Sequence, residues 1–176
     1  MLRFAFAVSL TLVFGGCSGV SEPTYSAELV PCEGVVMIGD APAADVEVVF
    51  TPASLAGDAS KAIAADKTDK DVRAGFATTG PDGRFSLISP PGGQVKDLEK
   101  FSGVLPGPYV VSFHKFAMPD GSTFTAEMAK TTAPQAAGAR DVVAPQFTRP
   151  QSSPAKVTVS QEGANNLEFK LPAVKK

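Results

Sequence analysis

The sequence predicts an all-β domain, a sandwich of about seven strands. Short apolar runs rich in Val, Ile and Phe recur along the chain, and 16 Gly and 15 Pro among its 176 residues mark turns between them. Several runs alternate apolar and polar positions, as a strand does when one of its faces covers a core. The length suits one domain, and 44% hydrophobic and 19% charged residues are typical of a globular protein.

The first two runs lie at residues 34–38 and 45–51. A Gly-Asp pair ends the first run, and Pro52 ends the second. Within the second run, one face of the predicted strand carries Val46, Val48 and Phe50. Glu47 lies on the opposite face, so we expect this strand to cover the core.

The next two runs, residues 75–79 and 84–88, are separated by a Gly-Pro-Asp-Gly segment. An Asp-Gly turn between two such runs is a strong signal for a β-hairpin. Asp82 is therefore expected to act as a turn residue and not as a metal ligand.

Three further runs complete the strand set, at residues 109–116, 156–159 and 167–171. In the first of them Tyr109, Val111 and Phe113 share the apolar face. Ser112 and His114 lie on the other face. The last two runs are separated by residues 163–166, which are of types that tolerate positive φ.

Three stretches lack this pattern of short strands and turns, at residues 53–72, 92–102 and 117–154. The first stretch is compatible with one helical turn or more around residues 59–65. Long connections in a compact domain are either functional or mobile, and the composition here favours mobility.

The N-terminal segment has the order of an export signal. Arg3 precedes an apolar stretch from Phe4 to Phe14, which two glycines and a cysteine follow. The stretch is shorter than the roughly 20 helical residues that cross a bilayer core, so we expect a signal peptide and not a permanent span.

The residues Phe14, Gly15, Gly16 and Cys17 resemble a lipobox, although that pattern usually has Leu or another aliphatic residue where Phe14 stands. The resemblance implies cleavage before Cys17 and covalent lipid on its thiol. The expected organisation is a signal peptide over residues 1–16, a tether over 17–31 and a β domain over 32–176. The expected location is the cell envelope, on the outer or inner membrane. The alternative is an ordinary signal peptide cleaved near a cysteine.

Cys32 is the only other cysteine. We interpret it as a small apolar residue at the beginning of a strand. The alternatives are an intermolecular disulfide or a reactive thiol and, if Cys17 carries no lipid, a disulfide between Cys17 and Cys32.

The strand pattern as a whole resembles a carboxypeptidase regulatory-like domain, of the transthyretin-like or prealbumin-like type. The matching segments are residues 34–36, 39–52, 79–87, 103–111, 145–147, 152–159 and 166–171. The resemblance implies a Greek-key β-sandwich with long loop inserts. Such domains are accessory modules without catalytic residues, so it also implies a non-enzymatic protein with a structural or protein-interaction role and no cofactor besides the lipid on Cys17.

Few residues suggest chemistry. His114 is the sole histidine, which excludes a paired-histidine zinc site, and no Gly-x-Ser-x-Gly sequence accompanies it. We expect a solvent-facing strand histidine. Asp66, Asp69 and Asp71 lack the spacing of a calcium loop, and a solvated charged loop is the favoured interpretation.

The expected partners are the membrane, reached through the lipid anchor, and envelope proteins or glycans. A net charge of −2 argues against nucleic acid. The alternative function is a carbohydrate-binding module on the cell surface. Its candidate stacking residues are Tyr25 and Tyr109, because the chain has no Trp and most of its Phe residues occupy inward-facing positions.

Overall fold

A computed structural model describes residues 28–57, 73–90 and 97–173 of the chain. Several expectations fall outside these ranges. They concern the signal peptide, the helical turn at residues 59–65, and Phe14, Gly15, Gly16, Cys17, Tyr25, Asp66, Asp69 and Asp71.

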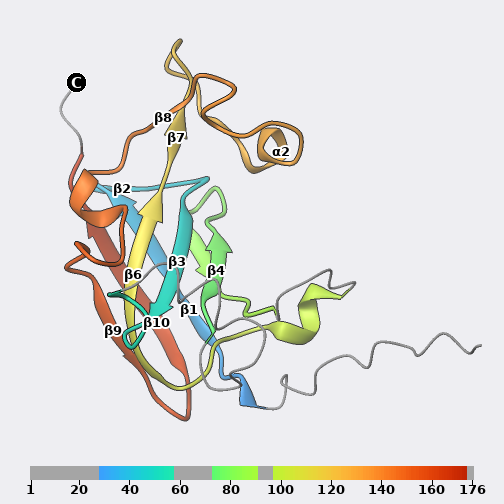
Figure 1. Ribbon diagram of the computed structural model, residues 1–176, viewed down its shortest axis with the longest axis vertical. Coiled ribbons are helices and arrows are strands. Elements are labelled where there is room, and N and C mark those ends of the chain that lie inside the picture. Colours follow the sequence, from blue (N-terminus) through green and yellow to red (C-terminus); the bar gives the residue numbers. More distant parts are fainter. Residues whose placement is uncertain (1–27, 58–72, 91–96, 174–176) are drawn as a thin grey trace, which may run out of the picture.

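The described residues are mostly β, and all seven predicted strands are present (Figure 1). They are β1 (Cys32–Ile38), β3 (Glu47–Pro52), β4 (Gly75–Thr78), β5 (Arg84–Ser86), β6 (Gly107–His114), β9 (Lys156–Val159) and β10 (Ala164–Leu171). Three strands that the sequence does not predict are β2 (Ala41–Pro42), β7 (Phe116–Ala117) and β8 (Arg140–Asp141). Each has two residues, which is too short to display an alternating pattern. The helical elements are η3 (Leu98–Phe101), α2 (Ala126–Ala129) and η4 (Pro145–Phe147).

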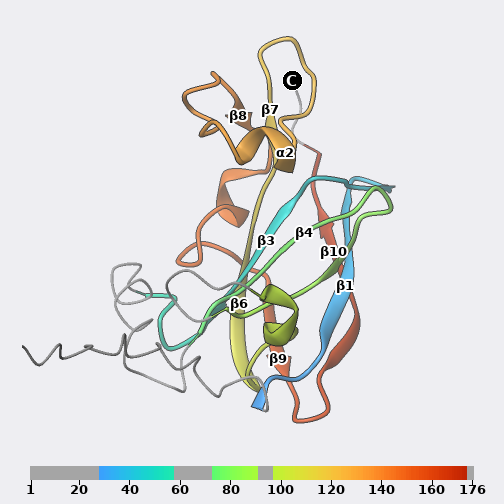
Figure 2. The same ribbon diagram turned by 90° about the vertical axis from the view of Figure 1, so that its right-hand side faces the viewer.

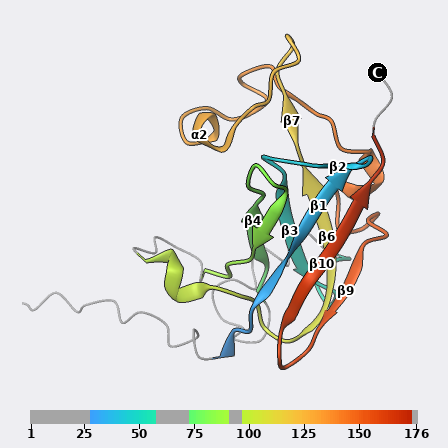
Figure 3. The same ribbon diagram turned by 180° about the vertical axis from the view of Figure 1, so that it is seen from behind.

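Two four-stranded sheets form the body of the domain. One runs β4-β3-β6-β9 and is antiparallel throughout. In the other, β1 pairs in parallel with β10 and antiparallel with β2 and β5. Figures 2 and 3 show β1 and β10 in one layer and β3 and β6 in the other. The arrangement is that of a β-sandwich, with the first and last long strands side by side.

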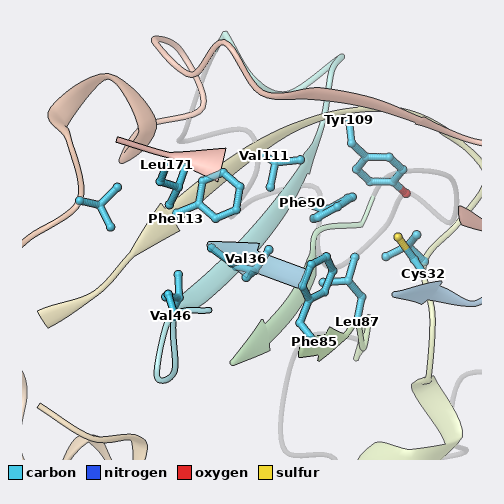
Figure 4. Packing of buried hydrophobic residues seen from close by; sticks show 14 of the residues in the cluster. Cys32, Val36, Val46, Phe50, Phe85, Leu87, Tyr109, Val111, Phe113 and Leu171 are labelled. Carbon is cyan, nitrogen blue, oxygen red and sulfur yellow. The ribbon is translucent and has the colours of Figure 1, made fainter. Parts of the chain in front are cut away.

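The apolar faces of both sheets meet in one core. Val46, Val48 and Phe50 are each 0% exposed, as the alternation in the sequence predicts, whereas Glu47 is exposed. Phe50 lies in a group of rings to which both sheets contribute (Figure 4). Its ring centroid is 5.8 Å from that of Tyr109 and 6.2 Å from those of Phe85 and Phe169.

The predicted hairpin is only partly correct. The turn forms, with Asp82 accepting a hydrogen bond from the backbone N–H of Arg84 at 3.1 Å. However, β4 pairs with β3, while β5 crosses to the other sheet and pairs with β1. One isolated bridge, between Phe76 and Ile88, joins the two runs. The turn therefore connects the two layers of the sandwich.

The prediction of mobility for residues 117–154 is wrong, because this insert folds against the sandwich. β7 and β8 pair with each other, and Thr125 caps the N-terminus of α2, its side chain accepting from the N–H of Met128. Val143 is a buried member of the core, and Phe147 packs against the core. α2 itself has only four residues. Among the described helices, none is long and apolar enough to cross a membrane.

The fold also includes the end of the segment assigned to the tether. Val30 exchanges two backbone hydrogen bonds with Val104, at 2.8 and 3.0 Å. The carbonyl of Pro31 accepts from the N–H of Ala164 at 2.9 Å. These bonds fix the start of β1 at the end of the sandwich opposite to α2, β7 and β8 (Figure 2).

Candidate functional site

His114 is the one predicted candidate that the structure places in a polar arrangement, and it does not face solvent as expected. It is the last residue of β6, and 29% of its side chain is exposed. Its Nδ1 lies 2.6 Å from Oδ2 of Asp141 on β8. Its ring is parallel to that of Phe116, with centroids 6.0 Å apart and an interplanar angle of 3°. The insert therefore covers the histidine.

Asp141 joins β6, β7 and β8 at one point. While Oδ2 contacts His114, Oδ1 accepts from the backbone N–H groups of Lys115 at 3.3 Å and Val143 at 3.0 Å. Sequence reasoning missed Asp141 because it lies in a stretch assigned to a mobile connection. The short run Asp-Val-Val that begins at Asp141 was the available signal, since Val favours strands.

The environment of His114 favours its protonated form. The hydrogen bond to Asp141 raises the pKa of His114 above its usual 6.5. Burial acts in the opposite direction, and the negative charges of Asp141 and Glu47 raise the pKa further. When His114 is protonated, the pair is a charge-assisted link between the sheet and the insert.

An open groove of about 490 Å³ separates the edge of the β4-β3-β6-β9 sheet from α2. Its described lining is mainly apolar, with Phe76 and Ile88 on the sheet side and Phe116, Phe124 and Ala129 on the insert side. Asp45, Glu47 and His114 are the charged or titratable residues of this lining. A second hollow of about 400 Å³ lies on the other side of His114 and includes Asp141 and Arg149.

Strand register explains why residues far apart in sequence share this groove. Glu47 lies opposite Thr78 on β4 and opposite His114 on β6. One step further along, Val49 lies opposite Phe76. Because alternate residues of a strand share a face, these side chains lie on the surface of the sheet that faces away from the core.

Cys32 is a small apolar residue at the beginning of a strand, as predicted. It is 1% exposed, and Figure 4 shows it beside the Tyr109 ring. Burial, followed by the charge of Glu33, raises the pKa of the Cys32 thiol to about 11. A thiol in this state carries almost no thiolate at neutral pH, which argues against a reactive cysteine.

Tyr109 is not available to stack on a sugar, which corrects the expectation that it serves a carbohydrate site. It is 3% exposed, and its hydroxyl donates to the backbone carbonyl of Leu105 at 2.7 Å. Burial and the neighbouring Cys32 raise the pKa of its phenol to about 12. Tyr109 is therefore part of the core.

Replacing Tyr109 with Phe keeps the ring and removes only the hydroxyl, which leaves the carbonyl of Leu105 without this donor. We expect the free energy of unfolding to fall by about 1.5 kcal/mol. Urea denaturation followed by circular dichroism measures this change. An unchanged midpoint would show that the bond contributes nothing to stability.

The described residues thus define an all-β domain with an open, mostly apolar groove beside a His-Asp pair. Within those residues, no group of three or more His, Cys, Asp and Glu side chains is placed to hold a metal ion. Comparisons of the chain with protein-family models, curated proteins and solved structures found no match.

Proposed function

We propose that this chain is a non-enzymatic, membrane-anchored envelope lipoprotein whose β-sandwich acts as a protein-interaction module. The observation that carries the proposal is the order of its first 17 residues: one basic residue, an apolar stretch, two glycines and Cys17. Two or more acyl chains, at about 0.8 kcal/mol per buried CH₂, hold a protein stably on a bilayer. We further propose that the sandwich is of the Greek-key, carboxypeptidase regulatory-like type.

The placement of the groove supports an interaction role. The start of the described chain, blue in Figure 2, lies at one end of the sandwich, whereas α2, β7 and β8 lie at the other. A lipid attached upstream of residue 28 thus joins the domain at the end remote from α2. The groove beside α2 then lies remote from the attachment point, where a partner can reach it.

Metabolic labelling with palmitate, followed by membrane fractionation, tests the anchor. We expect label and membrane association in the wild type and in Cys32→Ala, the matched control, and neither in Cys17→Ser. Equal labelling of Cys17→Ser, or no labelling of the wild type, would refute the lipoprotein assignment.

A further inference from the structure

We infer that the groove between β4 and α2 binds a peptide segment of a partner protein that presents a basic side chain flanked by apolar ones. This inference deepens the proposed interaction role, but it does not depend on the lipid anchor. The groove's volume of about 490 Å³ is within the usual range of ligand sites, roughly 300–1,000 Å³.

Exposed apolar surface is concentrated at this groove. The large hydrophobic side chains that the described residues expose are Phe76 at 41%, Met128 at 37% and Leu98 at 48%. Phe76 lines the groove, and Met128 belongs to α2, which forms its opposite wall. Clustered apolar exposure on a folded domain marks an interaction site more often than isolated exposed residues do.

The charges along the groove select a cation. The lining carries the carboxylates of Asp45 and Glu47, and neither forms an ion pair with another described residue. Of the described lining residues none is Lys or Arg, and His114 is already bonded to Asp141. An Arg or Lys side chain fits this pattern because its methylene groups pack on Phe76 while its charged head reaches the carboxylates. The ammonium of Lys115 donates to the carbonyl of Ala44 beside Asp45 but does not line the groove.

The apolar walls of the groove favour a peptide over a small amine. The outer edge of β4 is covered by residues 84–88, because Phe76 exchanges backbone hydrogen bonds with Ile88 and the N–H of Gly80 donates to the carbonyl of Arg84. A ligand therefore lies on the outer face of the sheet and not along its edge. Apolar side chains line both walls, Phe76 on the sheet and Phe124 on the insert. A peptide whose basic side chain is flanked by apolar ones covers more of this surface than a small amine does.

The test uses the purified full-length protein and a synthetic probe, N-acetyl-Gly-Leu-Arg-Leu-Gly-amide, followed by NMR chemical shifts. We expect shifts of the backbone amides of Glu47, Phe76, Thr78 and Phe124. Replacing the Arg of the peptide with Glu is expected to weaken binding by about tenfold, because it exchanges attraction for repulsion at the carboxylates.

Two variants and two matched controls locate the site. Glu47→Gln and Phe76→Ala are each expected to weaken binding by about fivefold, since central apolar and charged contacts dominate small interfaces. Glu162→Gln and Leu98→Ala change an exposed carboxylate and an exposed apolar side chain outside the groove, so the affinity should stay unchanged. Circular dichroism confirms that each variant is folded.

The inference is overturned if the groove amides do not shift, if the Glu peptide binds as tightly as the Arg peptide, or if both groove variants keep wild-type affinity. Hexylammonium that binds as tightly as the peptide would identify a small-amine site and overturn the assignment to a peptide. These outcomes do not depend on palmitate labelling. The experiments can therefore refute the lipid anchor and the peptide-binding groove separately.

Discussion

Replacing Phe50 with alanine is expected to lower the free energy of unfolding by about 4 kcal/mol. Phe50 is 0% exposed, and three aromatic rings from both sheets lie within 6.2 Å of its ring centroid. The substitution removes the side chain that connects the two layers and leaves a cavity that stiff, paired strands cannot close. Since domains of this size are stable by about 5–15 kcal/mol, the loss removes a large part of the total.

Chemical denaturation of the wild type and of Phe50→Ala measures this difference, with Phe76→Ala as the control. Phe76 is the same residue type but is 41% exposed, so its loss is expected to cost less than about 1 kcal/mol. Equal destabilisation by the two substitutions would contradict the central position of Phe50 in the core.

Replacing Asp141 with alanine is expected to cost about 3 kcal/mol, because one carboxylate accepts from two backbone N–H groups and also binds the His114 ring. The loss should also separate the insert from the sheet. Hydrogen exchange measures this effect, and the amides of Lys115 and Val143 are expected to lose protection. Unchanged protection would show that other contacts hold the insert in place.

Asp141→Asn isolates the charge of this pair and makes the stability less dependent on pH. In the wild type Asp141 raises the pKa of His114, so the pair stabilises the folded state fully below about pH 6.5. This contribution is lost as the pH rises through the higher pKa of the folded state. The charged groups that raise this pKa are Asp141 and Glu47, and Arg149 lines the hollow beside His114.

Stability profiles from pH 5 to pH 9 test this expectation. Asp141→Asn should be less stable than the wild type at the acidic end, and the difference should become smaller towards pH 9. NMR titration should give a lower pKa for His114 in the variant. A His114 pKa that does not change on substitution would contradict the assigned role of Asp141.

The local sequence was sufficient to identify a strand and its inner face wherever one face of that strand lies in the core. The alternation of Val46, Val48 and Phe50 identified the inner face of β3, and a Gly-Pro-Asp-Gly segment identified the turn before β5. The local sequence did not show which strands pair, because pairing depends on residues far away in the chain. The residues of that turn are compatible both with a hairpin and with a crossing between sheets, and the pairing of β5 with β1 decided between them.

The candidate site was less accessible to sequence reasoning. Period-two patterns place His114 opposite the core residues of its strand, but they contain no information on what covers that face. The insert that covers it is interrupted by prolines and has no sustained apolar periodicity, and it is held by contacts with residues far away in the chain, such as Asp141 with His114.

By itself, the sequence determined the seven strands of three or more residues, the inner face of β3 and the export-like order of the N-terminal segment, because these follow from the type and spacing of neighbouring residues. Only the tertiary structure decided which strands share a sheet, that residues 117–154 fold against the sandwich, and that Glu47, Phe76 and His114 line one groove. The physical reason is that burial and pairing energies depend on which surfaces meet in space, and here those surfaces come from segments tens of residues apart.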